Sequence, residues 1–281
     1  MDENFKDKTV IITGGSEGVG AAAARKFADA GANLVLAARG KKKLDKIAEE
    51  LRAKTNVALF AMDVADADAC ANLFRKAAFE FGKVNVLINN AGFHERGPVE
   101  NVSAEDLGIM IDVNLKAPII LCRLAIPHMR EAGEGAIVNV ASLAGRTPVP
   151  GAATYSASKF GLRAFTFALA DELRDEKIKL AVVSPGPIDT GFIMSNIDVV
   201  TDLTFSQPMS TADEVADEIF KLCINAKPER SMPPISGFLT TLMYVIPAIG
   251  RALRPALAAK GRRVKRQLKA QMRAAAREES S

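Results

Sequence analysis

The chain has 281 residues, 48% of them hydrophobic, which is enough apolar material to fill the core of one large α/β domain. Its three cysteines, Cys70, Cys122 and Cys223, are far apart and have no histidine at metal-ligand spacing, so neither a disulfide framework nor a metal site is expected. The polar, mixed-charge start over residues 1–8 cannot form the apolar core of a secretion signal, and we expect a cytoplasmic protein.

The formal net charge of +4 is distributed unevenly. Residues 251–281 hold ten Lys/Arg and two Asp/Glu, a balance of +8, which leaves −4 for residues 1–250. Because the excess positive charge is confined to the end of the chain, we expect a basic tail and not a basic domain. Aromatic residues are scarce in this tail, so we expect no nucleic-acid binding.

Short apolar runs alternate with helical patterns from the first residues onward. Strands are predicted at residues 10–12, 34–37, 57–62, 86–88, 136–140 and 180–184. Helical patterns follow at residues 21–30 and 44–54, and longer helices are predicted from Ser103 towards His128, from Tyr155 to about Glu176 and from Thr211 to about Asn225. Apolar runs of strand length joined by helices predict a single α/β domain with a doubly wound parallel sheet.

A glycine-rich turn follows the first predicted strand. Gly14, Gly18 and Gly20 permit a tight turn, close approach of a pyrophosphate, and packing of the next helix with its N-terminus facing the anion. The spacing Thr-Gly-x-x-x-Gly-x-Gly resembles that of the short-chain dehydrogenases/reductases. The turn therefore predicts a Rossmann-type dinucleotide site formed by Gly14, Ser16, Glu17, Gly18, Val19 and Gly20.

The end of the second predicted strand indicates which nicotinamide cofactor binds. An NAD enzyme places an acid there for the ribose 2′-hydroxyl, whereas an NADP enzyme needs a cation. Here the strand ends at Arg39, which suits a 2′-phosphate, and the lysines at 41–43 are expected in a solvated loop. Glu17, just before the middle glycine, would repel that phosphate. We expect NADP(H) to be preferred, with NAD(H) as the alternative.

Tyr155 and Lys159 lie four residues apart and hence on one face of a helix. A free tyrosine titrates near pH ~10, and an adjacent cation lowers that pKa towards a range useful for proton transfer. Ser142 follows the strand at 136–140, at the edge where ligands of an open α/β sheet bind. The three residues predict an acid–base site.

The resemblance to short-chain dehydrogenases/reductases extends over residues 8–225 and implies roles for these residues. It implies that Ser142 holds the substrate oxygen, Tyr155 exchanges its proton, and Lys159 also contacts the nicotinamide ribose. Asn114 matches an asparagine that anchors a water near the lysine, the alternative being an ordinary polar residue in a helix. The further cofactor contacts that the resemblance implies are Asp63, Val64, Asn90, Ala91, Gly92, Pro185, Gly186, Ile188 and Thr190. The asparagines at 89–90 have a structural alternative, the bracing of neighbouring strands.

The activity implied by the resemblance is hydride transfer between NADP(H) and a carbonyl or alcohol. The apolar segment after Thr190 corresponds to the family's substrate lid and suggests a lipophilic substrate, unless this segment simply packs on the domain. The alternative function is a catalytically idle NADP(H)-binding sensor or docking protein. His94 and His128 are interpreted as structural, although His94 and Arg96 follow the Asn-Asn-Ala-Gly motif closely enough to reach the substrate.

Beyond residue 227 the pattern changes, and we divide the chain into a dinucleotide-binding and catalytic domain, residues 1–234, and a helical C-terminal extension, residues 235–281. The apolar stretch at 235–249, interrupted by Pro247, is too short to cross a bilayer, which takes about 20 residues. With the basic residues behind it, the stretch is expected either to lie on an anionic membrane surface or to pack over the lid or a partner subunit. We expect this tail to replace the final strand segment through which many family members form tetramers, leaving a homodimer through the helices that begin near Ser103 and Tyr155.

Overall fold

Seven parallel strands form one sheet in the computed structural model, which describes residues 3–195, 197–225 and 227–278. The strand order is β3-β2-β1-β4-β5-β6-β7, so the chain winds outward in both directions from the boundary between β1 and β4. This reversal opens the crevice in which ligands of such sheets bind. The strands are β1 (Thr9–Thr13), β2 (Asn33–Ala38), β3 (Val57–Ala61), β4 (Val86–Asn89), β5 (Gly135–Val140), β6 (Ile178–Pro185) and β7 (Glu229–Met232).

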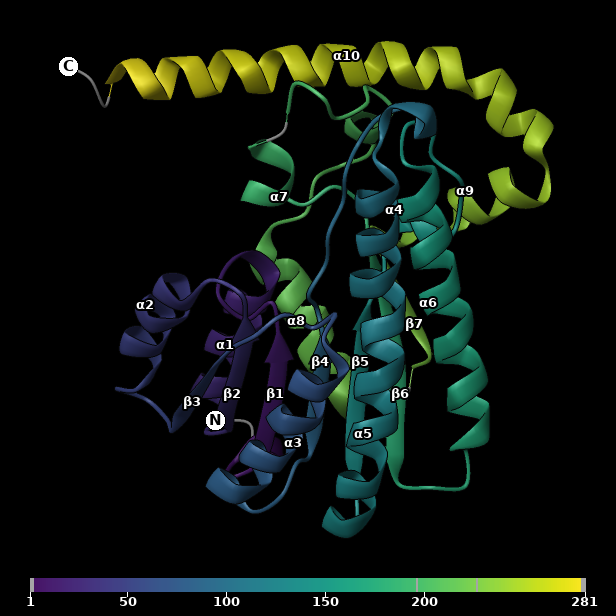
Figure 1. Cartoon of the computed structure of the whole chain (residues 1–281). Helices are drawn as coiled ribbons and strands as arrows, with labels where there is room; N and C mark the ends of the chain where they lie inside the picture. The colour runs from purple at the N-terminus through teal and green to yellow at the C-terminus, as the bar shows by residue number, and fades with distance from the viewer. Residues whose placement is uncertain (1–2, 196, 226, 279–281) are drawn as a thin grey trace.

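Helices cover both faces of the sheet (Figure 1). Alternate strand residues point to opposite faces, so that Val10 and Ile12 enter one core while Ile11 enters the other. The first core is closed by α1 (Gly18–Asp29), α2 (Lys41–Leu51) and α8 (Ala212–Ile224), and the second by α3 (Ala67–Phe81), α5 (Ala117–Ala132) and α6 (Ala153–Glu172). The predicted doubly wound α/β fold is confirmed.

The helix predicted from Ser103 is interrupted by one wider turn. It consists of α4 (Ala104–Ile111), a π-helical turn η3 (Asp112–Lys116) and α5. The π turn contains the buried Asn114, whose side-chain amide donates to the carbonyl of Phe93 at 2.7 Å and accepts from its N–H at 2.9 Å. Wider turns of this kind often occur at functional sites, and this one ties the helix to the loop after β4.

The lysine run and the final strand differ from the sequence-based expectations. Lys41, Lys42 and Lys43 form the first turn of α2 and not a loop. The tail does not replace the last strand, because β7 pairs with β6 before the extension begins. Apolar patterning missed β7 because it is a four-residue edge strand that contains Glu229 and Arg230.

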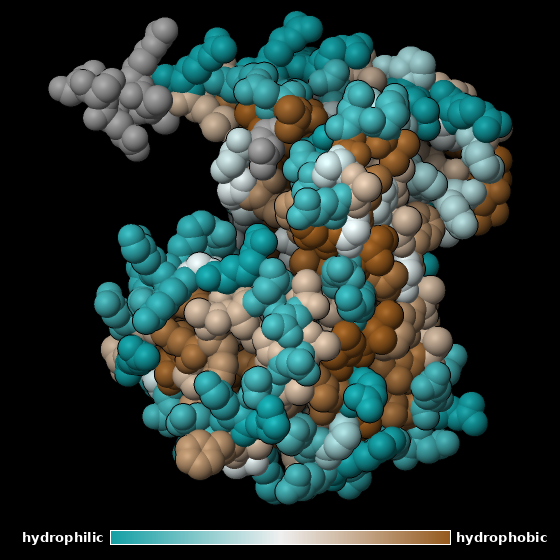
Figure 2. Space-filling model, in the orientation of Figure 1, coloured by the Kyte–Doolittle hydropathy of each residue, from teal (hydrophilic) through white to brown (hydrophobic). Residues whose placement is uncertain are grey.

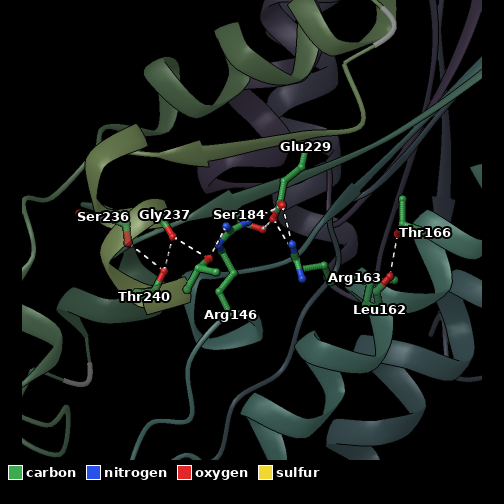
Figure 3. A network of polar contacts seen from close by, with 10 residues as sticks. Arg146, Leu162, Arg163, Thr166, Ser184, Glu229, Ser236, Gly237 and Thr240 are labelled. Atoms are coloured by element: carbon green, nitrogen blue, oxygen red, sulfur yellow. Dashed lines mark hydrogen bonds and ion pairs between the residues drawn. The ribbon is translucent and has the colours of Figure 1, made fainter. Parts of the chain in front are cut away.

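Glu229 on β7 is the centre of a polar network that links three parts of the fold (Figure 3). Its carboxylate accepts two hydrogen bonds of 2.9 Å from Arg163 on α6 and one of 3.0 Å from Ser184 on β6, and it pairs with Arg146. Arg146 in turn donates to the hydroxyl of Thr241 at 2.6 Å. The network therefore joins the loop after β5 to the sheet edge and to the first C-terminal helix.

The C-terminal extension forms α9 (Pro234–Val245) and α10 (Pro247–Glu278), and α10 crosses the carboxyl end of the sheet above α7 (Gly191–Met194) (Figure 1). The described parts of the lid segment, residues 191–206 without 196, form a small apolar core against α10, in which Ile193, Val200 and Phe205 are buried beside Val264 and Leu268 of the helix. None of the described helices is long and apolar enough to cross a membrane. The division of the chain at residue 234 remains a prediction.

Polar contacts also fasten α10 to the lid segment. The Lys265 ammonium donates to the carbonyls of Val200 at 2.7 Å and Asp198 at 3.0 Å, and Lys269 pairs with Asp198. At Gly261 the helix backbone lies so close that an added Cβ would stand 1.7 Å from the carbonyl oxygen of Asp202. Basic residues of α10 therefore bind the lid segment, which borders the cavity.

Candidate functional site

A cavity of about 1030 Å³ lies at the carboxyl edge of the sheet. Figure 2 shows the surface hollowed between the part that carries α1 and α2 and the part that carries α7 and α10. This volume is at the upper end of the range for small-molecule sites, about 300–1,000 Å³, and leaves room for a cofactor and a substrate. Every residue predicted to bind the cofactor lines the cavity except Gly20; Ser142, Tyr155 and Lys159 line it as well, and Asn114 does not.

The glycine turn has the form of a phosphate cradle. Gly14 has a φ of +65°, which favours glycine, and an added Cβ on Gly20 would stand 2.1 Å from the carbonyl oxygen of Gly14. No side chain caps the start of α1, since the N-cap residue Glu17 makes no capping hydrogen bond. The first N–H groups of α1 are thus left for a bound anion, and the turn fits a dinucleotide pyrophosphate.

The asparagine that ends β4 and the one that follows it brace neighbouring strands, which was the alternative to a cofactor contact. Asn89 donates to Asn139 of β5 at 2.8 Å. The Asn90 amide donates to the carbonyls of Thr13 at 3.0 Å and Gly14 at 3.2 Å, which ties the glycine turn to the neighbouring strand. Because Asn90, Ala91 and Gly92 line the cavity too, bracing and a cofactor contact are compatible at this position.

The residues that bear on cofactor choice lie where the cavity is lined by the start of α1, the end of β2 and the first turn of α2. Arg39 is exposed and lines it, and no described carboxylate pairs with its guanidinium. The Glu17 carboxylate accepts a 2.7 Å hydrogen bond from the ammonium of Lys43. This ion pair offsets the negative charge that sequence reasoning counted against a 2′-phosphate.

Ser142, Tyr155 and Lys159 converge on the cavity from two elements. Ser142 follows β5, and its hydroxyl accepts from the N–H of Ala144 at 3.1 Å, while Tyr155 and Lys159 lie on the first turns of α6. The buried Lys159 ammonium donates to the carbonyl of Val140 at 2.9 Å and lies 5.8 Å from the centre of the Tyr155 ring. The predicted trio is thus brought together in space.

The electrostatics of this trio follow from burial. Burial raises the pKa of Tyr155, while a hydrogen bond from Ser142 and the charge of Arg96 act in the opposite direction. Burial lowers the pKa of Lys159 to about 8. The lysine still carries its charge below that pH, where it can stabilise a tyrosinate beside it.

Asn114 links two of the elements that carry site residues. Besides its two hydrogen bonds with Phe93, its amide donates to the hydroxyl of Ser158 on α6 at 3.3 Å. It thereby ties the loop after β4 to the helix that carries Tyr155 and Lys159. The role that resemblance implies for it, the anchoring of a water, remains a prediction.

His94, Arg96 and Phe192 form a chain of contacts that begins at Tyr155. The ring of His94 stacks on that of Tyr155 with centroids 4.0 Å apart and an interplanar angle of 7°. The ring of Phe192 in the lid segment lies 6.3 Å from His94, and the guanidinium of Arg96 lies 5.8 Å from the centre of the Phe192 ring. His128, by contrast, stacks on Phe74 away from the cavity. His94 lines the cavity, so the structure is compatible with the alternative that His94 and Arg96 reach the substrate, and the role of His94 stays a prediction.

The C-terminal helices complete the cavity wall, which the sequence did not predict for particular residues. They contribute Thr240, Met243, Tyr244, Pro247, Gly250, Arg251, Arg254 and Leu257. Most buried apolar residues of the lid segment pack against α10, whereas Phe192, Val199 and Leu203, and also the buried Ile193, border the cavity. The lid segment and the extension therefore share this part of the cavity wall.

Comparisons with known proteins agree with this fold. A family model described as short chain dehydrogenase matches residues 8–198. A metagenomic short-chain oxidoreductase, solved in complex with NADP, superposes with a TM-score of 0.69 at 32% identity, covering 81% of this chain and 97% of that one. The chain belongs to the short-chain dehydrogenase/reductase family of oxidoreductases.

Relatives of known name include two reductases. Sulfoacetaldehyde reductase 2 of Chromohalobacter salexigens is 37% identical over 187 residues, which cover 66% of this chain and 74% of that protein. Ketoacyl reductase HetN of Nostoc sp. is 34% identical over 246 residues, which cover 85% of this chain and 84% of that protein.

Proposed function

We propose that the protein is an NADP(H)-dependent oxidoreductase that interconverts a carbonyl compound and an alcohol. The observation that carries the proposal is the convergence of Ser142, Tyr155 and Lys159 on one cavity that also contains the glycine cradle. When bound, the nicotinamide supplies the hydride for reduction and accepts it for oxidation. The two relatives, named as reductases of sulfoacetaldehyde and ketoacyl compounds, support a carbonyl substrate.

The roles of the protein's own groups follow from their placement. The hydroxyls of Ser142 and Tyr155 hold the substrate oxygen, and Tyr155 donates its proton as negative charge develops there. Lys159 is held beside Tyr155 by its hydrogen bond to Val140 and stabilises the tyrosinate that remains. Asn114 keeps the two helical residues in position through Ser158 and the backbone of Phe93.

The cofactor would be held by residues at the sheet edge in this proposal. The turn from Gly14 to Gly20 would hold the pyrophosphate, and Asp63 and Val64 would border the adenine. The residues on the nicotinamide side are Asn90, Ala91, Gly92, Pro185, Gly186, Ile188 and Thr190. Thr190 lies over the glycine turn, since an added Cβ on Gly18 would stand 3.5 Å from its methyl group.

NADP(H) is the preferred cofactor in this proposal because Arg39 is available for the 2′-phosphate. Hydrogen bonds to charged groups contribute about 1.5–3 kcal/mol. Replacing Arg39 with alanine should therefore lower kcat/KM for NADPH roughly tenfold to a hundredfold and leave kcat/KM for NADH nearly unchanged. Steady-state kinetics with both cofactors measures this, and Lys42→Ala, in the first turn of α2 and outside the cavity, is the matched control. An equal loss with both cofactors would remove the NADP preference from the proposal.

The proposal includes an apolar segment in the substrate. The cavity wall on the substrate side contains Val149, Phe192, Met243, Tyr244 and Leu257. These side chains suit a hydrocarbon portion next to the reacting carbonyl. Turnover of a panel of carbonyl compounds of increasing chain length, followed by NADPH absorbance, tests the substrate class. If NADPH binds and no carbonyl compound is turned over, the idle sensor or docking protein is the better description.

A peripheral membrane contact is the second part of the proposal, and the surface of α9 favours it. Ile235, Phe238 and Val245 are each about 68% exposed on this helix, and α10, which follows, has no acidic residue before Glu278. An exposed apolar face beside a basic helix suits a surface of anionic lipids.

Vesicle binding tests this surface in the full-length chain. The double variant Phe238→Glu with Val245→Glu should lose most of its co-sedimentation with phosphatidylglycerol vesicles, because both side chains would bring charge to the apolar interface. Phe79→Glu on α3, whose phenyl ring is 88% exposed, is the matched control. Equal sedimentation of the three proteins would rule out this surface.

The buried, free cysteines suit a reducing cytoplasmic compartment, and we propose this location for the protein. A homodimer through α4 and α6 stays a prediction.

A further inference from the structure

Arg96 lines the cavity and forms no ion pair with the described residues, although the adjacent Glu95 carboxylate attracts its charge. It follows β4 in the loop that starts with the Asn-Asn-Ala-Gly motif, and its side chain is partly buried. Its side chain makes no hydrogen bond or ion pair with the residues that the structure describes; the adjacent Glu95 accepts from the backbone N–H of Arg96 instead. A guanidinium has five N–H donors, and leaving them unpaired away from water is costly. Its place is thus suited to a ligand that brings the missing negative charge.

The orientation of Arg96 is set by its neighbours. The guanidinium lies over the ring of Phe192 at 5.8 Å, and a cation–π contact of this kind uses none of its N–H donors. The layers continue through His94 to Tyr155. The Nε2 atom of His94 is buried and has no hydrogen-bond partner among the described residues, so a second polar group is available beside Arg96.

Charge along the cavity wall is divided between its two ends. The carboxylates among the described lining residues are Glu17 and Asp63, both at the cofactor end, and Glu17 is paired with Lys43. The substrate end has Arg96 and, on α10, Arg251 and Arg254. Of these three, Arg96 is partly buried and interacts electrostatically with Tyr155, whereas the two on α10 are exposed. A neutral substrate would leave this end with uncompensated positive charge.

We propose that the substrate is a carbonyl or alcohol compound that carries an oxyanion group, such as a carboxylate or sulfonate, and that Arg96 binds this group. The inference rests on the proposed function and adds the chemical class of its substrate. The planar guanidinium matches a carboxylate or sulfonate with paired hydrogen bonds, and Nε2 of His94 adds a further contact. The reacting carbonyl then points to Ser142 and Tyr155, with the apolar part of the substrate between the two ends.

Matched substrates with and without the negative charge test the proposal. The probes are succinic, adipic and suberic semialdehydes, each compared with its methyl ester, in NADPH-dependent reduction. At the best chain length the acid should exceed its ester in kcat/KM by about tenfold to a hundredfold. Arg96→Gln should abolish most of this ratio by lowering kcat/KM for the acid and sparing the ester, and Arg96→Lys should restore part of it. Arg123→Gln, an exposed guanidinium on α5 outside the cavity, is the control.

Several outcomes would overturn the inference. Equal reduction of acids and esters by the unchanged protein would show that no oxyanion is recognised. Equal losses with acid and ester in Arg96→Gln would mean that Arg96 acts through Tyr155. Loss of the ratio in Arg251→Gln with Arg254→Gln instead would move the anion to α10. If no acid is reduced, binding is tested instead by measuring the melting temperature of the protein with NADPH, with and without each acid. An unchanged melting temperature would count against the inference. Failure of the proposed function differs from all of these, since either neither acids nor esters would be reduced, or turnover would persist in Tyr155→Phe.

Discussion

Replacing Tyr155 with phenylalanine should lower kcat for carbonyl reduction by about a hundredfold to ten-thousandfold, the usual contribution of a positioned general acid. The substitution removes the hydroxyl that gives up the proton and leaves the aromatic ring. The ring keeps its 4.0 Å stacking on His94, so the shape of the cavity should persist. The Kd for NADPH should change no more than about twofold, since the glycine turn and Lys159, which are proposed to hold the cofactor, are unchanged.

Steady-state kinetics and fluorescence titration with NADPH measure the two quantities separately. Tyr244→Phe is an instructive comparison, because Tyr244 is the other tyrosine of the chain and lies in the same cavity. Its hydroxyl has no place in the proposed proton transfer, and the effect on kcat should be far smaller. Undiminished turnover in Tyr155→Phe would end the assignment of Tyr155 as the proton donor.

Replacing Glu229 with alanine should lower the free energy of unfolding by about 3–5 kcal/mol, the usual effect of removing one partner from a buried ion pair. The side chains of Glu229 and Arg146 are 13% and 12% exposed, so the change leaves two guanidinium groups, those of Arg146 and Arg163, without their carboxylate in a poorly hydrated place (Figure 3). Urea unfolding measures the loss. Glu176→Gln, which breaks an exposed pair with Arg130, should hardly change the midpoint.

The contribution of Glu229 should depend on pH in a defined direction. Burial raises the pKa of Glu229, but hydrogen bonds from Arg163 and Arg146 outweigh it and hold the pKa below its usual value. A carboxyl with a lowered pKa in the folded state stabilises the fold above its unfolded pKa of about 4.3 and loses this effect as the pH falls through the folded value. The difference in unfolding free energy between the unchanged protein and Glu229→Ala should therefore shrink in acid. A difference that grew on acidification would contradict this account of the network.

The chemistry of the site was largely predictable from local sequence. The glycine turn at 14–20 and the pair Tyr155 and Lys159 are defined by spacing within one turn and one helix, so their geometry does not depend on distant parts of the chain. Ser142 could be placed because the carboxyl ends of parallel strands share one edge of the sheet. The strand β7 escaped prediction because the charge of Glu229 is compensated only when α6 and the loop after β5 are folded beside it.

Other residues of the site needed the tertiary structure. Nothing in the pattern around Arg96 shows that its guanidinium faces the cavity without a partner, since that depends on Phe192, almost a hundred residues further along the chain. The ion pair of Glu17 with Lys43, which removes an objection to NADP(H), likewise joins α1 to α2. Packing between distant segments decides such contacts.

The sequence by itself determined the fold class, the phosphate turn and the reacting trio, because hydrophobic periodicity and short spacings specify local geometry. Only the tertiary structure decided what the C-terminal extension does. From the sequence, its basic residues suggested a solvated or lipid-facing tail. In the structure, Lys265 instead binds the lid segment at the backbone carbonyls of Asp198 and Val200. The physical reason is that a lysine finds a backbone carbonyl to bind only once α10 lies across the sheet edge.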